Sequence, residues 1–394
     1  MDFIFFGFIA DIERLDSALS KEAAPQISAI KFQKALLQGL SERADVRIVA
    51  TLPIASFPRN KHLVTDSGRI NFEWPSVEGY LLPMVNLPLI KLAFRFFGGI
   101  IVGWRLCRHK KSDAILVYAT HTPFVAAASF LSSIFGIPFA VFIPDLPLHM
   151  RRQKERGSRG ILKRLDNKIL QHLIHKAAVT FPITVDVAKD WLPPNAKYTV
   201  IEGIAPTLHD TSIHEPSDGR KRLLYTGTLS QVSQFARMFS ESPELDAECI
   251  FIGGGPEFEE LKAIATADPR VIVKPFMAEP ELRKEFQAAD ILLNPRYTAW
   301  DGARYSFPSK LMDYMARGLP IISTRLAGIP PEYFNVFFAL DDTSRDSVSA
   351  SLQVALNASK DEYSRRIVAG YEMLKSAKSP RAVADLVVAS VIDC

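Results

Sequence analysis

The chain contains 394 residues, of which 48% are hydrophobic, 23% charged and 10% aromatic. This composition is too apolar for a disordered chain, and the length predicts two domains or one large α/β domain. The three cysteines are far apart and odd in number, which excludes a disulfide framework and a zinc site and favours small buried residues in a reducing cytosol. The apolar start, residues 1–7, lacks a basic segment and is interpreted as a first strand rather than a secretory signal.

Short β-rich segments alternate with longer helical ones along the chain, which predicts parallel sheets covered by helices. In the first half, strands are expected at 3–8, 46–51, 114–118, 139–143 and 179–182, and helices at 27–41 and 122–135. In the second half, strands are expected at 222–225, 247–252, 271–274, 291–294 and 320–323, and helices at 257–266, 279–288 and 309–316.

The polar segment 204–220, which contains two prolines and mixed charge, is the best candidate for a linker. It divides the chain into a first domain at 1–203 and a second domain at 204–375. A last helix within 376–394 completes the expected organisation.

The apolar segment 81–107 is long enough to cross a membrane but contains Lys91, Arg95 and Arg105. A charge at mid-span costs about 2.5–3.5 kcal/mol on insertion scales, so three charges disfavour a spanning helix. A helix lying in the membrane interface is favoured, and a buried helix whose charged side chains reach solvent is the alternative. The membrane-facing side is expected to carry Leu89, Leu92, Phe96 and Ile100.

Two basic clusters lie in the first half of the chain. Residues 151–168 contain eight lysines and arginines against two acids, and residues 105–111 form the second cluster. Such patches attract anionic membranes, phosphates or nucleic acid. Nucleic acid is the weakest of these partners, because the clusters lack interleaved aromatic residues and any recognised module. We therefore expect segments 81–111 and 151–168 to contact a membrane surface.

The passage with the strongest chemical signal runs from residue 294 to 318. A strand is expected to end at Asn294, and after a loop a helix begins near Ser309, with Ser306 or Ser309 as its cap. A helix N-terminus presents free N–H groups that suit a diphosphate, and Lys310 adds a positive charge there.

Three further residues of this passage fit an activated nucleotide. Arg296 and Arg304 can reach the diphosphate from the loop. Asp313 lies one helical turn, about 5.4 Å, beyond Ser309, which suits hydrogen bonds from ribose hydroxyls. An exposed aspartate on an ordinary capped helix is the alternative interpretation of Asp313.

Two glycine turns follow earlier strands of the same half. Gly227 and Thr228 come directly after one strand, and Gly253 and Gly254 follow the next. Glycine lets a ligand approach the backbone closely, although neither turn matches the dinucleotide or P-loop fingerprint. Because open α/β sheets bind ligands beyond the carboxyl ends of their strands, the three turns together predict an anion site.

This combination resembles the second domain of glycosyltransferase family 4, retaining sugar-nucleotide-dependent enzymes of the GT-B fold, over residues 222–333. The branch with Asn-Pro-Arg and Ser-Phe-Pro-Ser-Lys, often found with surface-polysaccharide assembly, is the most similar. The resemblance is carried in order by Tyr-Thr-Gly, Gly-Gly-Gly-Pro, Ala-Asp-Ile-Leu-Leu-Asn-Pro, Ser-Phe-Pro-Ser-Lys-Leu-Met-Asp-Tyr-Met-Ala and Gly-Leu-Pro-Ile-Ile-Ser-Thr.

The resemblance implies two Rossmann-like domains and a C-terminal helix that packs back across them. It implies hexosyl transfer with retention from a nucleotide-diphosphate sugar to a glycan or a polyprenyl-diphosphate-linked acceptor. The expected enzyme is cytoplasmic, peripheral on the membrane, and active without a metal or other cofactor. Lys310 would stabilise the leaving diphosphate electrostatically.

The sequence departs from the family pattern at two points. The family has two glutamates eight positions apart; Asp313 occupies the second position, and Tyr305 occupies the first. The family's basic pair after the first glycine turn is also missing. The substitutes that we expect to neutralise the diphosphate are Arg296, Arg304 and Lys310.

In the first domain, the resemblance implies an acceptor side lined by residues that follow strands. His121 and Asp145 are the candidates, and deprotonation of the acceptor is assigned to Asp145 or to the leaving phosphate. A turn residue that caps helix 122–135 is the alternative for His121. Two other functions remain open: an epimerase on the same architecture, and a non-catalytic partner that keeps the fold.

Overall fold

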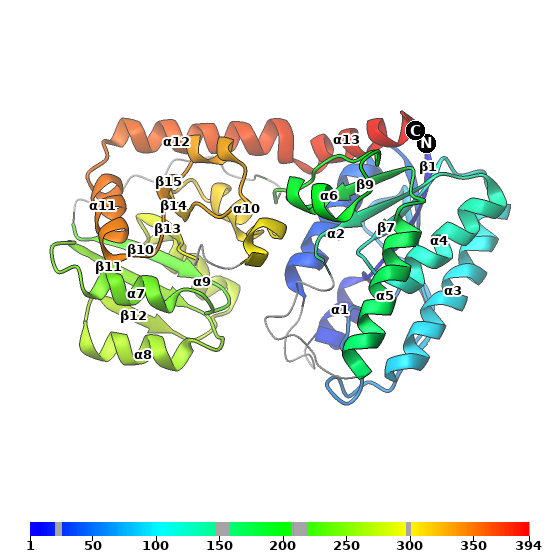
Figure 1. Ribbon diagram of the computed structural model, residues 1–394, viewed down its shortest axis with the longest axis horizontal. Coiled ribbons are helices and arrows are strands. Elements are labelled where there is room, and N and C mark those ends of the chain that lie inside the picture. Colours follow the sequence, from blue (N-terminus) through cyan, green and yellow to red (C-terminus); the bar gives the residue numbers. More distant parts are fainter. Residues whose placement is uncertain (20–25, 147–157, 207, 209–218, 297–300, 394) are drawn as a thin grey trace. The chain divides into compact units, whose positions relative to one another are not determined.

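The protein is described here by a computed structural model, in which the chain forms two compact units. The first contains Met1–Ile204, Tyr305–Phe307 and Lys378–Cys394, and the second contains Ala205–Arg304 and Pro308–Ala377. The elements of both units are labelled in Figure 1. The residues that the structure describes are 1–19, 26–146, 158–206, 208, 219–296 and 301–393.

The first unit is built on a seven-stranded sheet in the order β4-β5-β2-β1-β7-β8-β9. Neighbouring strands are parallel except for the antiparallel pair β4 and β5. The strands are β1 (Asp2–Gly7), β2 (Asp45–Ala50), β4 (Gly68–Asn71), β5 (Val77–Leu81), β7 (Ala114–Tyr118), β8 (Phe139–Ile143) and β9 (Val179–Pro182). A small antiparallel pair, β3 (Val64–Thr65) and β6 (Met84–Val85), is separate from this sheet.

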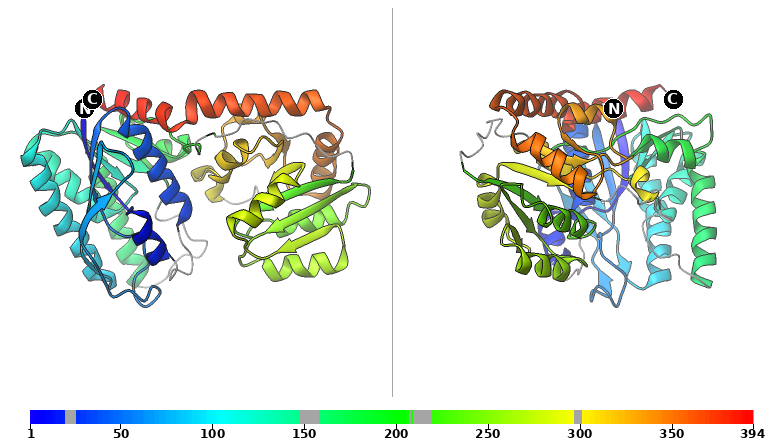
Figure 2. Two further views of the ribbon diagram at one scale, coloured as in Figure 1. Left: turned by 180° about the vertical axis from the view of Figure 1, so that it is seen from behind. Right: turned by 60° about the vertical axis from the view of Figure 1, so that its left-hand side comes forward.

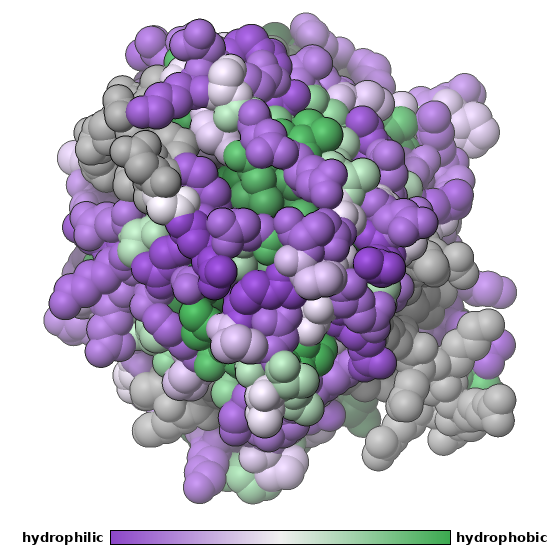
Figure 3. Space-filling model, turned by 90° about the vertical axis from the view of Figure 1, so that its left-hand side faces the viewer, coloured by the Kyte–Doolittle hydropathy of each residue, from purple (hydrophilic) through white to green (hydrophobic). Residues whose placement is uncertain are grey.

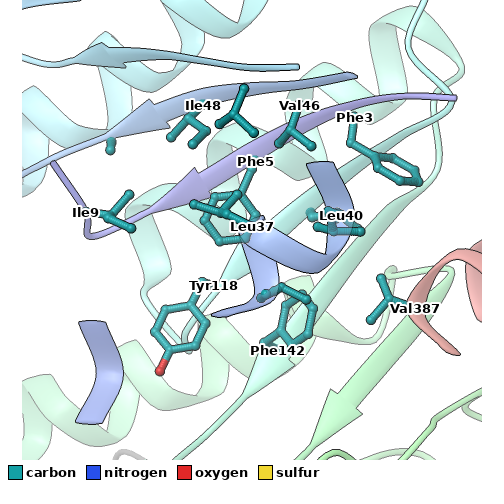
Figure 4. Close-up of a cluster of buried hydrophobic side chains, with 14 of the residues drawn as sticks. Phe3, Phe5, Ile9, Leu37, Leu40, Val46, Ile48, Tyr118, Phe142 and Val387 are labelled. Carbon is teal, nitrogen blue, oxygen red and sulfur yellow. The ribbon is translucent and has the colours of Figure 1, made fainter. Parts of the chain in front are cut away.

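Alternating side chains of β1 enter two different cores, because successive residues of a strand point to opposite faces. Phe3 and Phe5 lie in the first core, and Ile4 and Phe6 lie in the second. Figure 4 shows the first core. Helices α1 (Ile12–Leu19), α2 (Ile27–Ser41) and α13 (Pro380–Ile392) contribute to the first core. Helices α3 (Pro88–His109), α4 (Thr122–Phe135), α5 (Ser158–Ile174) and α6 (Val185–Trp191) contribute to the second.

The second unit is built on a six-stranded, fully parallel sheet in the order β12-β11-β10-β13-β14-β15. Its strands are β10 (Lys221–Thr226), β11 (Ala247–Ile252), β12 (Val271–Lys274), β13 (Ile291–Asn294), β14 (Ile321–Thr324) and β15 (Phe338–Leu340). Its α-helices are α7 (Ser233–Ser240), α8 (Phe258–Ala267), α9 (Glu279–Gln287), α10 (Lys310–Met315), α11 (Arg345–Leu356) and α12 (Lys360–Met373). Short 3-10 helices cover Asp301–Tyr305 and Pro331–Asn335, and a π-helical turn covers Leu374–Lys378.

The predicted architecture of parallel sheets covered by helices is confirmed, and each expected strand is found within one residue or two of its predicted bounds. Three strands of these sheets, β4, β5 and β15, were not anticipated. Segment 81–107 is not one continuous helix as expected. Leu81 ends β5, β6 follows, and α3 begins only at Pro88. Pro88 fits the first helical turn, and the residue before it is held in an extended conformation.

The orientation of α3 also differs from the expected one. Lys91 and Arg95 are both buried. The alternative hypothesis, a buried helix whose charged side chains reach solvent, required both side chains to be exposed. Phe96 and Ile100, expected on the outer side, pack against the second core. Leu89 and Leu92 are exposed as expected. Among the described residues, none of the helices combines the length and apolar character that a membrane crossing requires.

The reason for this orientation is a stripe of residues spaced four apart. Lys91, Arg95, Gly99 and Gly103 share one helical face, and all four are buried. A methyl group on Gly99 would lie 3.2 Å from the ring of Phe6, and one on Gly103 would lie 2.5 Å from Leu131. The two glycines therefore bring α3 close to β1 and α4, and the same face carries the two cations inward.

Candidate active site

The candidate site of the second unit lies where the order of its parallel strands reverses. From β10 the chain continues to β11 and β12 on one side, and then to β13 on the other side of β10. Open α/β sheets bind ligands beyond the carboxyl ends of the strands at such a switch point. Gly227 follows β10 and Arg296 follows β13, so both lie at this point.

Lys310, the first residue of α10, is held against the end of β10. Its Nζ donates a hydrogen bond to the carbonyl oxygen of Thr226 at 2.9 Å and lies 3.6 Å from the ring centroid of Tyr225. Gly227 has a φ of +123°, and a Cβ at this position would lie 3.2 Å from the Lys310 Nζ. Glycine at 227 therefore fits both the backbone conformation and the space beside the ammonium group.

The site is cationic. Burial lowers the pKa of Lys310 well below its ordinary value, and the nearby charge of Arg296 lowers it further. Arg296 forms a hydrogen bond with the Tyr225 side chain, and its Nε is buried without a partner. Among the described residues, no carboxylate forms an ion pair with Lys310 or Arg296. Two adjacent cations of this kind favour an anionic ligand.

Tyr314, a residue that the sequence analysis did not single out, fixes the turn. It is buried in α10, and its hydroxyl oxygen accepts a hydrogen bond from the Thr226 backbone N–H at 2.9 Å. Its spacing of four residues from Lys310 places both side chains on the same face of α10. The two side chains together hold both the N–H and the carbonyl group of Thr226.

The two glycine turns pack against each other and are joined by backbone hydrogen bonds. Gly253 has a φ of +150°, and a Cβ there would lie only 1.8 Å from the Gly227 carbonyl oxygen. Backbone hydrogen bonds join the turns, from the Gly227 N–H to Ile252 and from the Leu229 N–H to Gly254. Gly253 is buried, whereas Gly227, Thr228 and Gly254 are exposed. Close packing of two backbones thus accounts for the glycine at 253, and its contact with a ligand stays a prediction.

The N-terminus of α7, which follows the first glycine turn, is occupied by a side chain of the protein. The Glu257 carboxylate accepts hydrogen bonds from the backbone N–H groups of Gln231, Val232 and Ser233 at 2.7–3.0 Å. These N–H groups are therefore not available to a ligand anion. Within the turn, the Gly227 N–H is bonded to Ile252, so the backbone N–H that remains available is that of the exposed Thr228.

The other predicted residues of this passage are less closely associated with the cationic site. Arg304 is exposed at the end of a 3-10 helix, Ser309 is exposed, and Asp313 is half-buried in α10. Ser306 belongs with Tyr305 and Phe307 to the first unit. The expected side-chain cap at Ser309 is absent, because α10 begins at Lys310 and Ser309 itself has helical backbone angles. Residues 297–300 of the passage lie outside the described residues.

Tyr305, which stands where the family has its first glutamate, has a structural partner. Its hydroxyl group donates a hydrogen bond to Asp190 Oδ2 at 2.7 Å, and its ring packs on the second core. Both residues belong to the first unit. The tyrosine therefore contributes to packing at a position where the family has a charged group.

The two candidates of the first unit follow neighbouring strands. His121 follows β7, and Asp145 is exposed after β8. His121 stands at the N-cap position of α4, as the alternative interpretation expected, but its side chain makes no capping hydrogen bond. Its Nε2 lies 3.0 Å from Arg95 Nη1, and burial together with the charge of Arg95 lowers the pKa of His121. Desolvation by surrounding protein raises the pKa of Asp145 to about 6.

Comparison with known proteins connects the second unit to a family. Residues 220–350 match the family model described as "Glycosyl transferases group 1". This segment contains Gly227, Arg296 and Lys310, and therefore the whole cationic site. The matched segment is about a third of the chain.

The fold of the whole chain is the GT-B fold. The chain is similar to an α,α-trehalose-phosphate synthase (UDP-forming) from Burkholderia vietnamiensis, with a TM-score of 0.66, 11% identity and coverage of 100% of this chain and 98% of that one. The lipopolysaccharide outer core galactosyltransferase WaaB gives a TM-score of 0.60 with 14% identity over 99% of each chain. HepE from Anabaena, solved in complex with UDP-glucose, gives 0.57 with 11% identity over 100% of each chain.

A curated protein is similar over a shorter segment. The amylovoran biosynthesis glycosyltransferase AmsK of Erwinia amylovora is 41% identical over 86 residues. This segment is 21% of the present chain and 21% of AmsK, so the matched part spans about a fifth of that protein's length.

Proposed function

We propose that the protein is a retaining hexosyltransferase that uses a nucleotide-diphosphate sugar and acts in surface polysaccharide biosynthesis. The observation that carries the proposal is the pair of cations, Lys310 and Arg296, beside the exposed turn at Gly227. This site lies inside the segment that matches the group 1 glycosyltransferases. The similarity to AmsK, and to HepE in complex with UDP-glucose, supports the same function.

In the proposed reaction, the bond between the sugar C1 and the diphosphate breaks, and the acceptor oxygen bonds to C1 on the same face. Negative charge grows on the departing diphosphate, where Lys310, Arg296 and the backbone N–H of Thr228 stabilise it. Asp313 accepts hydrogen bonds from the ribose, and Arg304, Ser306 and Ser309 contribute to donor binding. These groups belong to the protein, so the proposal requires no metal or other cofactor.

The acceptor proton goes either to the leaving phosphate or to Asp145. If Asp145 is the base, it must be ionised, so kcat/KM is expected to rise with pH to a plateau above about pH 6, where its pKa lies. Asp145→Asn removes this limb of the profile, while Asp16→Asn, a change of an exposed aspartate on α1, keeps it. An unchanged limb in Asp145→Asn assigns the proton to the leaving phosphate.

The experiment that tests the function combines binding and product analysis. Thermal unfolding is measured with UDP, GDP, CDP and TDP, and the sugar conjugates of the best nucleotide are then offered with glycan and lipid-linked acceptors. An elongated acceptor that keeps the anomeric configuration supports the proposal. An epimer as product supports the epimerase alternative. Indifference to every nucleotide contradicts the proposal and favours a non-catalytic partner, which the tyrosine at position 305 also fits.

The acceptor side of the proposal is a polyprenyl-diphosphate-linked or glycan substrate at the cytoplasmic face of a membrane. The outer side of α3 supports this location, because Ile90, Phe94, Phe97 and Ile101 form an exposed apolar stripe. Arg105 and Arg108 continue the same side and are also exposed. Figures 1 and 2 show α3 and α4 side by side, and α4 packs on α5.

The apolar surface continues over the neighbouring helices. Phe130 and Ile134 are exposed on α4, and Ile161, Leu162, Leu165 and Ile169 are exposed on α5. Lys163, Arg164 and Lys168 provide basic groups on α5, whereas residues 151–157 of the predicted basic cluster lie outside the described residues. In contrast, the side of the second unit that carries α8 and α11 is mainly hydrophilic (Figure 3). Apolar residues with adjacent basic groups are typical of a surface that binds anionic lipid.

We expect the protein to sediment with vesicles that contain anionic phosphatidylglycerol, and to do so less at high salt. The double change Phe97→Ser and Ile101→Ser is expected to abolish most of this binding, because it removes apolar area that enters the lipid. Val368→Ser, a change of an exposed apolar residue on α12, serves as the control. Sedimentation that is indifferent to lipid charge, to salt and to the double change contradicts the membrane surface.

A further inference from the structure

The first unit contains a second switch point with buried positive charge. Its central strand β1 has β2 on one side and β7 on the other, and the chain changes sides between β2 and β7. Phe8 follows β1 and His121 follows β7, so both lie at the carboxyl ends where such sheets bind ligands. The side chain of Arg95 enters the same place from α3.

Arg95 is buried, with 7% of its surface exposed, and it has no acid as a partner among the described residues. Its Nη1 donates to His121 Nε2, its Cζ lies 4.9 Å from the Phe8 ring centroid, and its Nε is buried without a partner. Removing a cation from water costs several kcal/mol unless a counter-charge compensates it. The part of the chain that the structure describes supplies none, so the counter-charge is expected to come from a ligand.

The hydrogen bond from Arg95 also determines the state of His121. A guanidinium group has only donors, so His121 Nε2 must accept and the ring proton must be on Nδ1. Nδ1 is buried without a partner. His121 is therefore a neutral ring with a free donor, since burial and the charges of Arg95 and Lys91 all lower its pKa.

Two further sources of positive potential surround this pair. Lys91, one turn before Arg95 on α3, is buried and donates to the Ile54 carbonyl oxygen. Helix α4 begins at Thr122 with no side-chain cap, so its N-terminal dipole points to the same place. The charges of Arg95 and Lys91, together with the N-terminus of α4, match a dianionic phosphate or diphosphate better than a single carboxylate.

We propose that Arg95, His121 and the N-terminus of α4 form a binding site for a phosphate or diphosphate group of the acceptor. This proposal rests on the proposed transferase function, which supplies the acceptor. It deepens that function by naming the residues that hold a phosphate group of the acceptor. The phosphate is held by the first unit, whereas the donor diphosphate is held at Lys310 in the second.

The test is made in the Lys310→Met variant, so that the donor site does not bind the probe. Inorganic pyrophosphate is titrated by calorimetry, and the ring nitrogens of His121 are followed by NMR, with the resonance assigned by its loss in His121→Gln. We expect pyrophosphate to bind and to shift the His121 Nδ1 resonance. Arg95→Met is expected to weaken binding about tenfold or more, and Arg95→Lys to weaken it less. Arg381→Met, a change of an exposed arginine on α13 of the same unit, is expected to have no effect.

The source of the phosphate is distinguished by two further probes. Geranyl diphosphate binding more tightly than pyrophosphate indicates a lipid carrier, and glucose 6-phosphate binding more tightly indicates a phosphorylated sugar. Pyrophosphate that leaves the His121 resonance unchanged overturns the proposal, and this measurement does not depend on how well Arg95→Met folds. Nucleotide binding by the unaltered chain is measured separately. Its failure contradicts the transferase, whereas a failure of pyrophosphate alone contradicts only the phosphate site.

Discussion

Replacing Lys310 with methionine is expected to lower kcat about a hundredfold or more, with a smaller change in KM. The ammonium group lies at the end of β10 beside the exposed turn, where the leaving diphosphate gains charge during the reaction. An interaction that strengthens in the transition state affects turnover more than substrate binding. Losses of this size are typical when one preorganised donor to a developing anion is removed. The measurement is steady-state kinetics with the donor identified by the nucleotide panel.

Methionine keeps the length of the lysine and part of its contact with the Tyr225 ring, so the variant separates charge from packing. Its thermal unfolding is recorded beside that of Lys284→Met, which changes an exposed lysine of α9 in the same unit. The control is expected to keep full turnover. An effect of Lys310→Met on KM alone would mean that the ammonium group only binds the ground state. Normal kinetics in a folded variant would refute its role in leaving-group stabilisation.

Replacing Gly253 with alanine is expected to destabilise the second unit by about 3 kcal/mol or more. The added Cβ would stand 1.8 Å from the Gly227 carbonyl oxygen, and the φ of +150° is one that L side chains rarely adopt. Neither turn can relax freely, because backbone hydrogen bonds join them. The expected fall in Tm is about 6–12 °C for a unit of this size, measured by calorimetry. Nucleotide binding is expected to fall as well, since the turn at Gly227 must move.

The matched control is the next residue along the chain. Gly254 is exposed, and a Cβ there would meet nothing within 4 Å. Gly254→Ala is therefore expected to change Tm by no more than about 2 °C. Equal stability of the two variants would show that the packing of the two turns does not determine the structure of this region.

Much of the fold could be predicted from the sequence because its strands are nearly continuous apolar segments bounded by turn residues. Strands such as β8 and β11 are buried on both faces in parallel sheets, so their composition alone marks them. The cationic site could be anticipated for a related reason. Glycine turns and basic residues at the carboxyl ends of parallel strands must meet at one edge of a sheet, which is how Gly227, Arg296 and Lys310 come together.

The details of the site depended on contacts between distant segments. Sequence reasoning treated Gly253 and Gly254 alike, but only Gly253 is packed against another backbone. It expected a serine side chain to cap α10, whereas the helix begins one residue later and Tyr314 stabilises the neighbouring turn. In the sequence, Tyr305 indicated only that the first glutamate of the family is missing. Its hydrogen bond to Asp190, 115 residues away, could not be inferred from local spacing.

The sequence by itself determined the α/β class, the positions of most strands and the edge of the sheet at which the cations of the second unit gather. These features follow from local composition and from the periodicity of strands. Only the tertiary structure decided which side of α3 faces inward, because that helix is apolar on both sides. Close approach at Gly99 and Gly103 selects the side that also carries Lys91 and Arg95, and so places two charges where hydropathy alone predicts none.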